Sequence, residues 1–266
     1  MIGILNVTPD SFSDGGRYLD PARAVEHGLR LAEEGASLVD VGGESTRPGA
    51  ERVPEEVELQ RVLPVVTALA EAGVVVSVDT MRASVARACV EAGARMVNDV
   101  SGGLADPAML PAVAGLDVDY VAMHWRAHST EMGSRARYTD VVADVVAELS
   151  ARVRAALEAG VAPERLVLDP GIGFAKDAGH NWRLLTGLDA LTALGHRVLV
   201  GVSRKRFLGP LLADPTGEPR PPRERDAASV ALTTLLAERG VWAVRTHSVR
   251  DHVDAARVVH RWTHPT

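Results

Sequence analysis

The stretch PARAVEHGLRLAEEGASLVDVG, residues 21–42, contains a helix pattern, a stop signal and a strand pattern in direct succession. Its first part carries apolar residues at spacings of three and four, which is typical of an amphipathic helix. Gly35 follows where that helix should end, because glycine readily adopts the left-handed conformation that closes many helices. The run LVDVG is short, apolar and rich in β-branched residues, as expected of a buried strand. The stretch therefore predicts one helix–strand unit.

The same unit recurs along all 266 residues. The predicted strands are IGILN (2–6), LVDVG (38–42), VVVSVD (74–79), MVNDV (96–100), YVAMH (120–124), LVLDP (166–170), VLVGVS (198–203) and AVRTH (243–247). Further glycines stand at the expected helix ends, at positions 73, 93, 160, 195 and 240. Eight such units predict a single (β/α)8 TIM barrel over residues 1–266, since that α/β fold typically needs about 250 residues.

An open, doubly wound parallel sheet is the alternative. That fold usually carries a glycine-rich phosphate fingerprint in its first turn, whereas the first turn here is NVTPDSFSDGG. The later stretch GIGFAK, residues 171–176, has a lysine where the third glycine of such a fingerprint would stand. The sequence therefore favours the barrel.

Composition narrows the classes of function. A net charge of −6 argues against a general nucleic-acid surface. No run approaches the ~20 apolar residues of a membrane span, and the start MIGILNV lacks the features of a signal peptide. The single cysteine, Cys89, excludes an internal disulfide and is expected to be a buried thiol. We expect a cytoplasmic protein that binds neither nucleic acid nor membrane.

Polar residues stand where most of the predicted strands end, the face on which such barrels carry their chemistry. They are Asn6, Asp40, Asp79, Asn98, Asp99, His124, Asp169, Ser203, Arg204, Lys205, Arg245 and His247. A single buried Asp could simply cap the following helix. Unpartnered buried polar groups cost about 1–3 kcal/mol each, so their recurrence at eight strand ends indicates a functional site.

The groups divide by charge. Asp79, Asn98 and Asp169 could face the barrel mouth together, where they would suit a flat heterocycle with several N–H donors. A divalent metal cage is the competing interpretation, because Asp and Asn also bind Mg²⁺. Cations follow strands 2, 7 and 8, in the loop GGESTRPGA (42–50), in SRKR (203–206) and in VRTH (244–247). The ends of strands 7 and 8 are a favoured phosphate position in this fold, although SRKR alone could be a solvated basic face.

These motifs resemble the dihydropteroate synthases, pterin-binding TIM-barrel enzymes of folate biosynthesis that are sulfonamide targets. The matching stretches are GILNVTPDSFSDGG, DVGGESTRPGA, SVDT, NDVSGG, MH, DPGIGFAK, SRKRFLG and VRTH, in the family's order over residues 1–262. The resemblance implies a transferase that joins (7,8-dihydropterin-6-yl)methyl diphosphate to 4-aminobenzoate, with Mg²⁺ as cofactor and a homodimer as the assembly. The segment WRAHSTEM after MH departs from the pattern of many family members.

The resemblance also assigns roles to residues. It implies catalytic roles for Arg47, Asp79, Lys205, Arg245 and His247, and pterin contacts from Asp79, Asn98, Met123, Asp169, Phe174 and Lys205. It places Asn6, Thr46, Arg47, Arg245 and His247 at the diphosphate, with Asn6 also holding the metal. It places Phe12, Thr46, Arg47, Pro48, Lys205 and Arg206 at the aminobenzoate, and Asp14 in loop closure.

Three rivals remain. A methyltetrahydrofolate-binding methyltransferase would share the pterin slot but would have no use for a diphosphate site with Arg245 and His247. A non-catalytic pterin-binding paralogue would not need Asn6 or Thr46. A Schiff-base aldolase would use Lys205, whose pKa the flanking arginines could lower, but the sequence offers it no separate base.

Overall fold

The computed structural model describes residues 1–8, 20–47 and 49–265, and its sheet is a closed parallel barrel. The strands are β1 (Ile2–Asn6), β2 (Leu38–Gly42), β3 (Val76–Asp79), β4 (Met96–Asp99), β5 (Asp119–Met123), β6 (Leu166–Asp169), β7 (Arg197–Gly201) and β8 (Ala243–Thr246). Each strand pairs with its neighbours in sequence, and β8 returns to β1 through Ile2↔Arg245 and Gly3↔Thr246. The predicted barrel is confirmed, and the open sheet is wrong.

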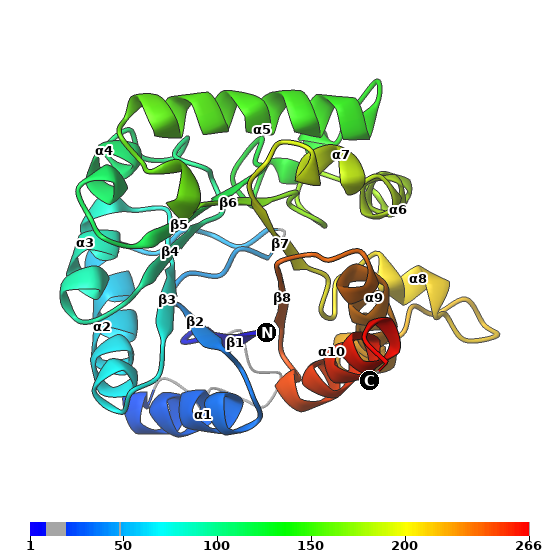
Figure 1. Cartoon of the computed structure of the whole chain (residues 1–266), viewed down its shortest axis with the longest axis horizontal. Coiled ribbons are helices and arrows are strands. Elements are labelled where there is room, and N and C mark those ends of the chain that lie inside the picture. The colour runs from blue at the N-terminus through cyan, green and yellow to red at the C-terminus, as the bar shows by residue number, and fades with distance from the viewer. Residues whose placement is uncertain (9–19, 48, 266) are drawn as a thin grey trace.

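Helices surround the strands as a ring (Figure 1). They are α1 (Pro21–Glu33), α2 (Glu55–Glu71), α3 (Ala83–Glu91), α4 (Met109–Ala114), α5 (Val141–Glu158), α6 (Ala178–Thr186), α7 (Asp189–Thr192), α8 (Leu208–Leu211), α9 (Asp226–Glu238) and α10 (Val249–Thr263). The predicted glycine stops are confirmed, because the glycines at positions 35, 73, 93, 160, 195 and 240 all have φ between 70° and 111°. These glycines let each helix end and the chain turn into the next strand.

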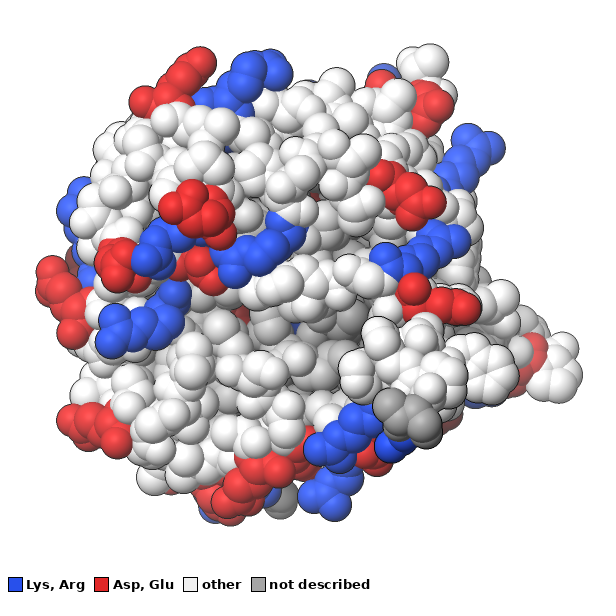
Figure 2. Space-filling model, in the orientation of Figure 1, with Lys and Arg blue, Asp and Glu red and all other residues white. Residues whose placement is uncertain are grey.

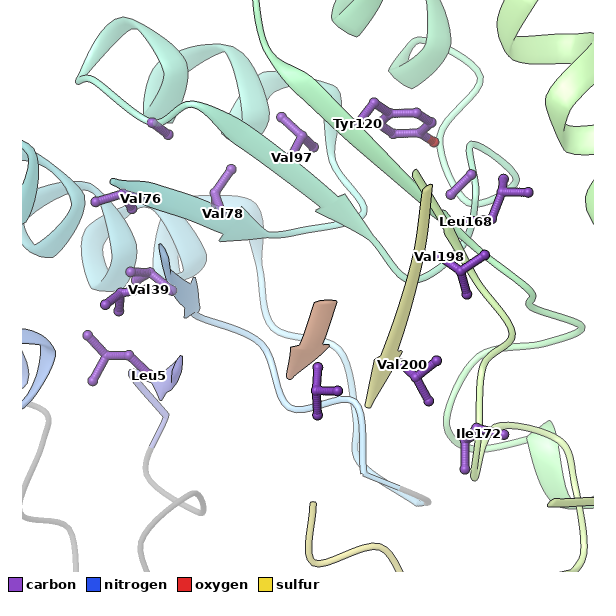
Figure 3. Close-up of a cluster of buried hydrophobic side chains, with 14 of the residues drawn as sticks. Leu5, Val39, Val76, Val78, Val97, Tyr120, Leu168, Ile172, Val198 and Val200 are labelled. Atoms are coloured by element: carbon purple, nitrogen blue, oxygen red, sulfur yellow. The ribbon is translucent and has the colours of Figure 1, made fainter. Parts of the chain in front are cut away.

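The core has two layers, because side chains alternate between the two faces of each strand. One layer fills the space between sheet and helices, with Leu5, Val39, Val78, Val97 and Val200 among its residues (Figure 3). The other lies inside the barrel and consists of Ile2, Met96, Val121, Val167 and Leu199. The interior of the barrel at the carboxyl ends of the strands is therefore lined by the polar residues that follow this inner layer along the strands.

Charges of both signs lie on the surface of the protein. On the face seen in Figure 2, basic and acidic side chains alternate around a hollowed, largely uncharged centre, and the described residues form no broad basic patch on it. No described helix has the length and apolar character needed to cross a bilayer. Cys89 is fully buried in α3, as expected, and burial raises the pKa of its thiol to about 12.

Candidate active site at the mouth of the barrel

Contacts across the barrel show which strand-end residues face its interior. Arg245 of β8 bonds to Asp40 of β2 and to Asp79 of β3, although neither strand is adjacent to β8. Asn98 of β4 also reaches Asp40, past the intervening strand β3. Bonds between non-neighbouring strands can form only through the interior. Asp79, Asn98 and Arg245 therefore meet inside the barrel, near the carboxyl ends of their strands.

The floor of the site is a continuous chain of charge-assisted hydrogen bonds. Arg245 donates from Nε to Asp40 Oδ2 over 2.6 Å and from Nη2 to Asp79 Oδ2 over 2.8 Å. Asn98 donates from Nδ2 to the same Asp40 oxygen over 2.9 Å. Because a carboxylate only accepts, Asp40 fixes the orientation of the Asn98 amide. Arg245, expected at the diphosphate, thus has its guanidinium tied to the acidic floor.

Burial shifts the ionisation of the two carboxylates that were predicted to hold the pterin. It raises the pKa of Asp79 to about 7, and the Arg245 guanidinium opposes that rise. It also raises the pKa of Asp169, whose Oδ1 accepts a 2.7 Å bond from the N–H of Gly171. Each carboxylate keeps acceptor capacity beyond these bonds. Such groups suit a ligand that presents several N–H donors.

Lys205 lies beside Asp169 at the edge of this floor. Its Nζ donates to the carbonyl oxygen of Ile172 and stands 4.9 Å from the centroid of the Phe174 ring. Burial lowers the pKa of Lys205 to about 8; Asp169 opposes this shift and Arg245 adds to it. The amine therefore stays largely protonated at neutral pH, close to an aromatic face.

An apolar wall completes the slot. Met81, Val100 and Met123 form a buried cluster separate from the two core layers, and Phe174 packs against it. Met123 and Phe174 were predicted as pterin contacts, whereas Met81 and Val100 were not predicted. Each follows a site residue by two positions, Asp79 and Asn98 in turn, so the two-residue period of a strand could have indicated them.

The rim carries a histidine that is neutral. Burial lowers the pKa of His247 well below its usual value, and the nearby cations, including Arg204 and Arg47, lower it further. Ser203 Oγ accepts from the His247 backbone N–H over 3.2 Å and lies 3.0 Å from His247 Nδ1. The hydroxyl proton is then directed to Nδ1, which leaves the imidazole proton on Nε2 as a donor.

The loop after β2 extends towards the opposite side of the barrel. Its Gly49 N–H donates to the carbonyl oxygen of Ser129, in the connection between β5 and α5, over 2.9 Å. Thr46 is half-buried and Arg47 is exposed on this loop. Gly43, at the start of the loop, is needed for close approach, because a Cβ there would lie 2.7 Å from Val62 of α2. The predicted residues Phe12, Asp14 and Pro48 lie outside the described residues.

The basic run after β7 separates into different environments. Arg204 forms two 2.7 Å bonds to Asp226 of α9, so it serves to hold the turn. Lys205 enters the site, and Arg206 is exposed. The aldolase alternative relied on both arginines to depress the pKa of Lys205. Burial and Arg245 are the causes that lower it instead.

Asn6, the predicted metal ligand, lies at the end of β1 beside Asp79. A Cβ on Gly42 would stand 3.4 Å from both Asn6 Oδ1 and Asp79 Cβ, so these two side chains flank the same glycine. Mg²⁺ usually keeps several waters and binds one or two protein oxygens together with substrate phosphates. An amide oxygen beside a carboxylate fits that pattern. The metal-cage alternative used Asp79, Asn98 and Asp169; in the structure Asp79 Oδ2 accepts from the Arg245 guanidinium, a cation that competes with a metal for that oxygen.

Two strand-end residues that were expected at the mouth point away from it. Asp99 bonds to Tyr120 and to Ser101 beneath the helices. His124 contacts Lys176 and Glu148 of α5. Each directly follows an inward-facing residue, so strand alternation turns its side chain outward. The expectation that all eight strand ends contribute to one site is therefore wrong for these two.

Comparison with known proteins agrees with this geometry. A family model described as pterin binding enzyme matches residues 2–247. The dihydropteroate synthase of Mycobacterium leprae (strain TN) is 57% identical over 265 residues, which cover 99% of this chain and 93% of that protein. The dihydropteroate synthase of Yersinia pestis, solved with a sulfonamide drug, has a TM-score of 0.92 and 40% identity, covering 98% of this chain and 93% of that one.

The dihydropteroate synthase of Xanthomonas albilineans is similar in two complexes. The structure with 4-aminobenzoic acid has a TM-score of 0.90 and 48% identity, covering 100% of this chain and 93% of that one. The structure with 7,8-dihydropteroate has a TM-score of 0.87 and 45% identity, covering 100% and 94%. The chain therefore belongs to the pterin-binding enzyme family, in its dihydropteroate synthase group.

Proposed function

We propose that this chain is a dihydropteroate synthase, a transferase that joins (7,8-dihydropterin-6-yl)methyl diphosphate to 4-aminobenzoate and releases pyrophosphate. The observation that carries the proposal is the shared interior site, in which Asp79, Asn98 and Asp169 offer acceptors beside an apolar wall. A flat, N–H-rich ring fits such a slot. The relatives named above carry this activity in their names, and two of their structures hold the aminobenzoate substrate or the dihydropteroate product.

The same geometry supports a mechanism based on charge rather than on a covalent intermediate. As the C–O bond to the diphosphate lengthens, Arg47 and the His247 Nε2–H would stabilise the departing charge at the rim. Asp79 and Asp169 would stabilise positive charge that spreads into the pterin, which favours a dissociative path. The neutral arylamine nitrogen then attacks the exocyclic methylene carbon, and the new C–N bond is completed by loss of one N–H proton from that nitrogen. Asn6 would hold Mg²⁺, which neutralises diphosphate charge when bound.

The direct test is pyrophosphate release from the pterin diphosphate, measured with and without 4-aminobenzoate and with and without Mg²⁺. We expect release that requires both, together with formation of 7,8-dihydropteroate. Release that does not depend on aminobenzoate would contradict the proposal. The homodimer and the cytoplasmic location remain predictions, which sedimentation and fractionation would test.

The methyltransferase and the non-catalytic paralogue would share the pterin slot. Pterin binding therefore cannot separate them from the synthase, but turnover of the diphosphate can. Arg47 lies close enough to His247 for its charge to lower the pKa of the histidine. This proximity favours the synthase, because the two side chains together form a site suited to an anion. Methyl transfer from a methylated folate would release no diphosphate anion that could occupy that site.

A further inference from the structure

The chain uses lysine at only two positions, Lys176 and Lys205, among its 29 lysine and arginine residues. Both amines contact one loop, residues 170–177, which connects β6 to α6 and follows Asp169 directly. Lys205 belongs to the proposed site. Lys176 is buried, with 8% of its surface exposed, and it is not one of the residues assigned to that site.

The loop has a backbone that needs external support. Gly171, Gly173 and Ala175 have φ values of 67°, 83° and 47°, so left-handed residues alternate along it. Gly171 could not carry a side chain, because a Cβ would stand 2.4 Å from the carbonyl oxygen of His124. Side-chain donors hold four carbonyl groups of the loop. Lys176 donates to two of them, Gly171 O and Phe174 O, and Lys205 donates to Ile172 O. The Tyr138 hydroxyl donates to Ala175 O over 3.0 Å. The shape that places Phe174 beside the slot thus depends on these donors.

The contacts of Lys176 favour its ammonium form over the neutral amine. Its Nζ lies 3.0 Å from Gly171 O, 3.1 Å from Phe174 O and 2.9 Å from His124 Nδ1. His124 Nε2 lies 2.9 Å from Glu148 Oε2. Because the pKa of Glu148 is lowered to about 2, its oxygen accepts, and Nε2 must carry the histidine proton. His124 Nδ1 is then an acceptor, so all three neighbours of Lys176 accept a hydrogen bond from it, and the Gly171 carbonyl also accepts from the Phe174 N–H over 3.0 Å.

We propose that Lys176, held by His124 and Glu148, is a positioning residue for the pterin slot. Its three donated bonds fix the loop so that Phe174 and the Ile172 carbonyl, which anchors Lys205, keep their places. The inference rests on the proposed function, because it takes the slot to be the pterin site. A compact ammonium with three donors fits between two carbonyls and an imidazole, whereas a planar guanidinium would not. This gives a reason for lysine at position 176 in a chain that has only one other lysine.

The charge of Lys176 should couple to ligand binding. Burial lowers the pKa of Lys176 to about 7. The charged groups that face it are Asp169 and Glu148, which favour the ammonium, and Lys205 and Arg126, which oppose it; neutral His124 and the Tyr138 ring complete its surroundings. A neutral amine has two N–H donors for three acceptors. If the ordered loop binds pterin best, pterin must in turn raise the pKa of Lys176.

The first test compares Lys176→Met with Arg183→Met. Arg183 is an exposed basic residue on α6, the helix that follows the 170–177 loop, so it is the control. We expect Lys176→Met to raise the Kd of 6-hydroxymethylpterin and the KM of its diphosphate at least about tenfold, because two carbonyls lose their donors. The KM of aminobenzoate and the affinities of Arg183→Met should change less than about threefold. Loss of folded protein alone would lower kcat without changing either KM.

The second test uses the wild-type chain and so does not depend on the folding of a variant. Carbon-13-labelled lysine gives side-chain signals from only two residues, and Lys205→Met assigns them. We expect the Lys176 signal to titrate near neutral pH and to shift its midpoint upward when 6-hydroxymethylpterin saturates the site. An unchanged Lys176 titration, or equal pterin affinity of wild type and Lys176→Met, would overturn the inference alone. Failure of the wild type to bind the pterin would overturn the proposed function as well.

Discussion

Arg245 is the residue on which the charge balance of the site depends. Its guanidinium bonds to Asp40 and Asp79, and it lowers the pKa of Asp79 against the effect of burial. It also lowers the pKa of Lys205. One side chain therefore sets the ionisation of both a floor carboxylate and the amine beside it, so its removal should move two titrations in the same direction.

The rate should follow a bell-shaped pH profile that Arg245→Gln moves to higher pH. The value of kcat/KM for the pterin substrate should rise as Asp79 ionises, with a pKa of about 7, and fall as Lys205 loses its proton, with a pKa of about 8. The proposed loss of pterin affinity when Lys176 loses its proton, with a pKa of about 7, would add a fall, so the profile is compared in a Lys176→Met background that removes it. Without the guanidinium both pKa values increase, so both limbs shift upward. Arg87→Gln, an exposed charge on α3, is the control and should leave both limbs in place. A shift of one limb alone would contradict this coupling.

At the level of elements, a buried ion cluster ties the loop after β2 to α2 and to the loop after β3. Glu44 Oε2 accepts from the Val53 N–H over 3.2 Å and from Arg82 Nη1 over 2.9 Å, so both ends of the loop are joined. Arg82 also bonds to Glu58, which is fully buried in α2 and accepts 2.6 Å from the Thr80 hydroxyl. Arg52 also bonds to Glu44, over 3.1 Å, so this cluster holds the part of the loop next to Val53, whereas Thr46 and Arg47 are not among its members.

Removing Arg82 should therefore destabilise the fold. Arg82→Ala leaves the buried Glu58 without its cation and Glu44 with Arg52 alone, and breaking such a buried pair costs about 3–5 kcal/mol. Denaturant unfolding would measure the loss. Arg30→Ala removes an exposed pair with Glu26 on α1 and should cost only about 0.3–0.5 kcal/mol. Adding Glu58→Gln to Arg82→Ala should recover part of the stability; a double variant less stable than Arg82→Ala would show that the buried charge is not the cause.

The strands and the glycine stops could be predicted from sequence because they depend on local periodicity. The same periodicity, applied strictly, would have separated Asn98 from Asp99 and Met123 from His124, since neighbouring strand residues face opposite sides. The cluster around Arg82 could not be predicted in this way. Its members are far apart in the chain and only the closed barrel brings them together, as it does the bonds of Arg245 to β2 and β3. Similarly, nothing in GIGFAK showed that its lysine would turn back onto the loop.

At the scale of the whole molecule, cross-barrel contacts join the two halves of the chain. Arg245 of β8 bonds to Asp40 of β2 and to Asp79 of β3, which belong to the first four strands. A half-barrel would expose the inner core layer and leave these charges unpaired. The predicted single domain over residues 1–266 should therefore unfold as one unit.

The chain offers an independent probe of each half. Its four tryptophans lie at positions 125, 182, 242 and 262, all beyond β5, whereas its single thiol, Cys89, is buried in α3. The thiol is inert while buried, because its pKa is raised to about 12. For a single cooperative unit, pulse labelling of Cys89 and tryptophan fluorescence must give the same denaturant midpoint. Labelling at clearly lower denaturant would show that the N-terminal half opens first, and the barrel would then behave as two folding units joined by Arg245.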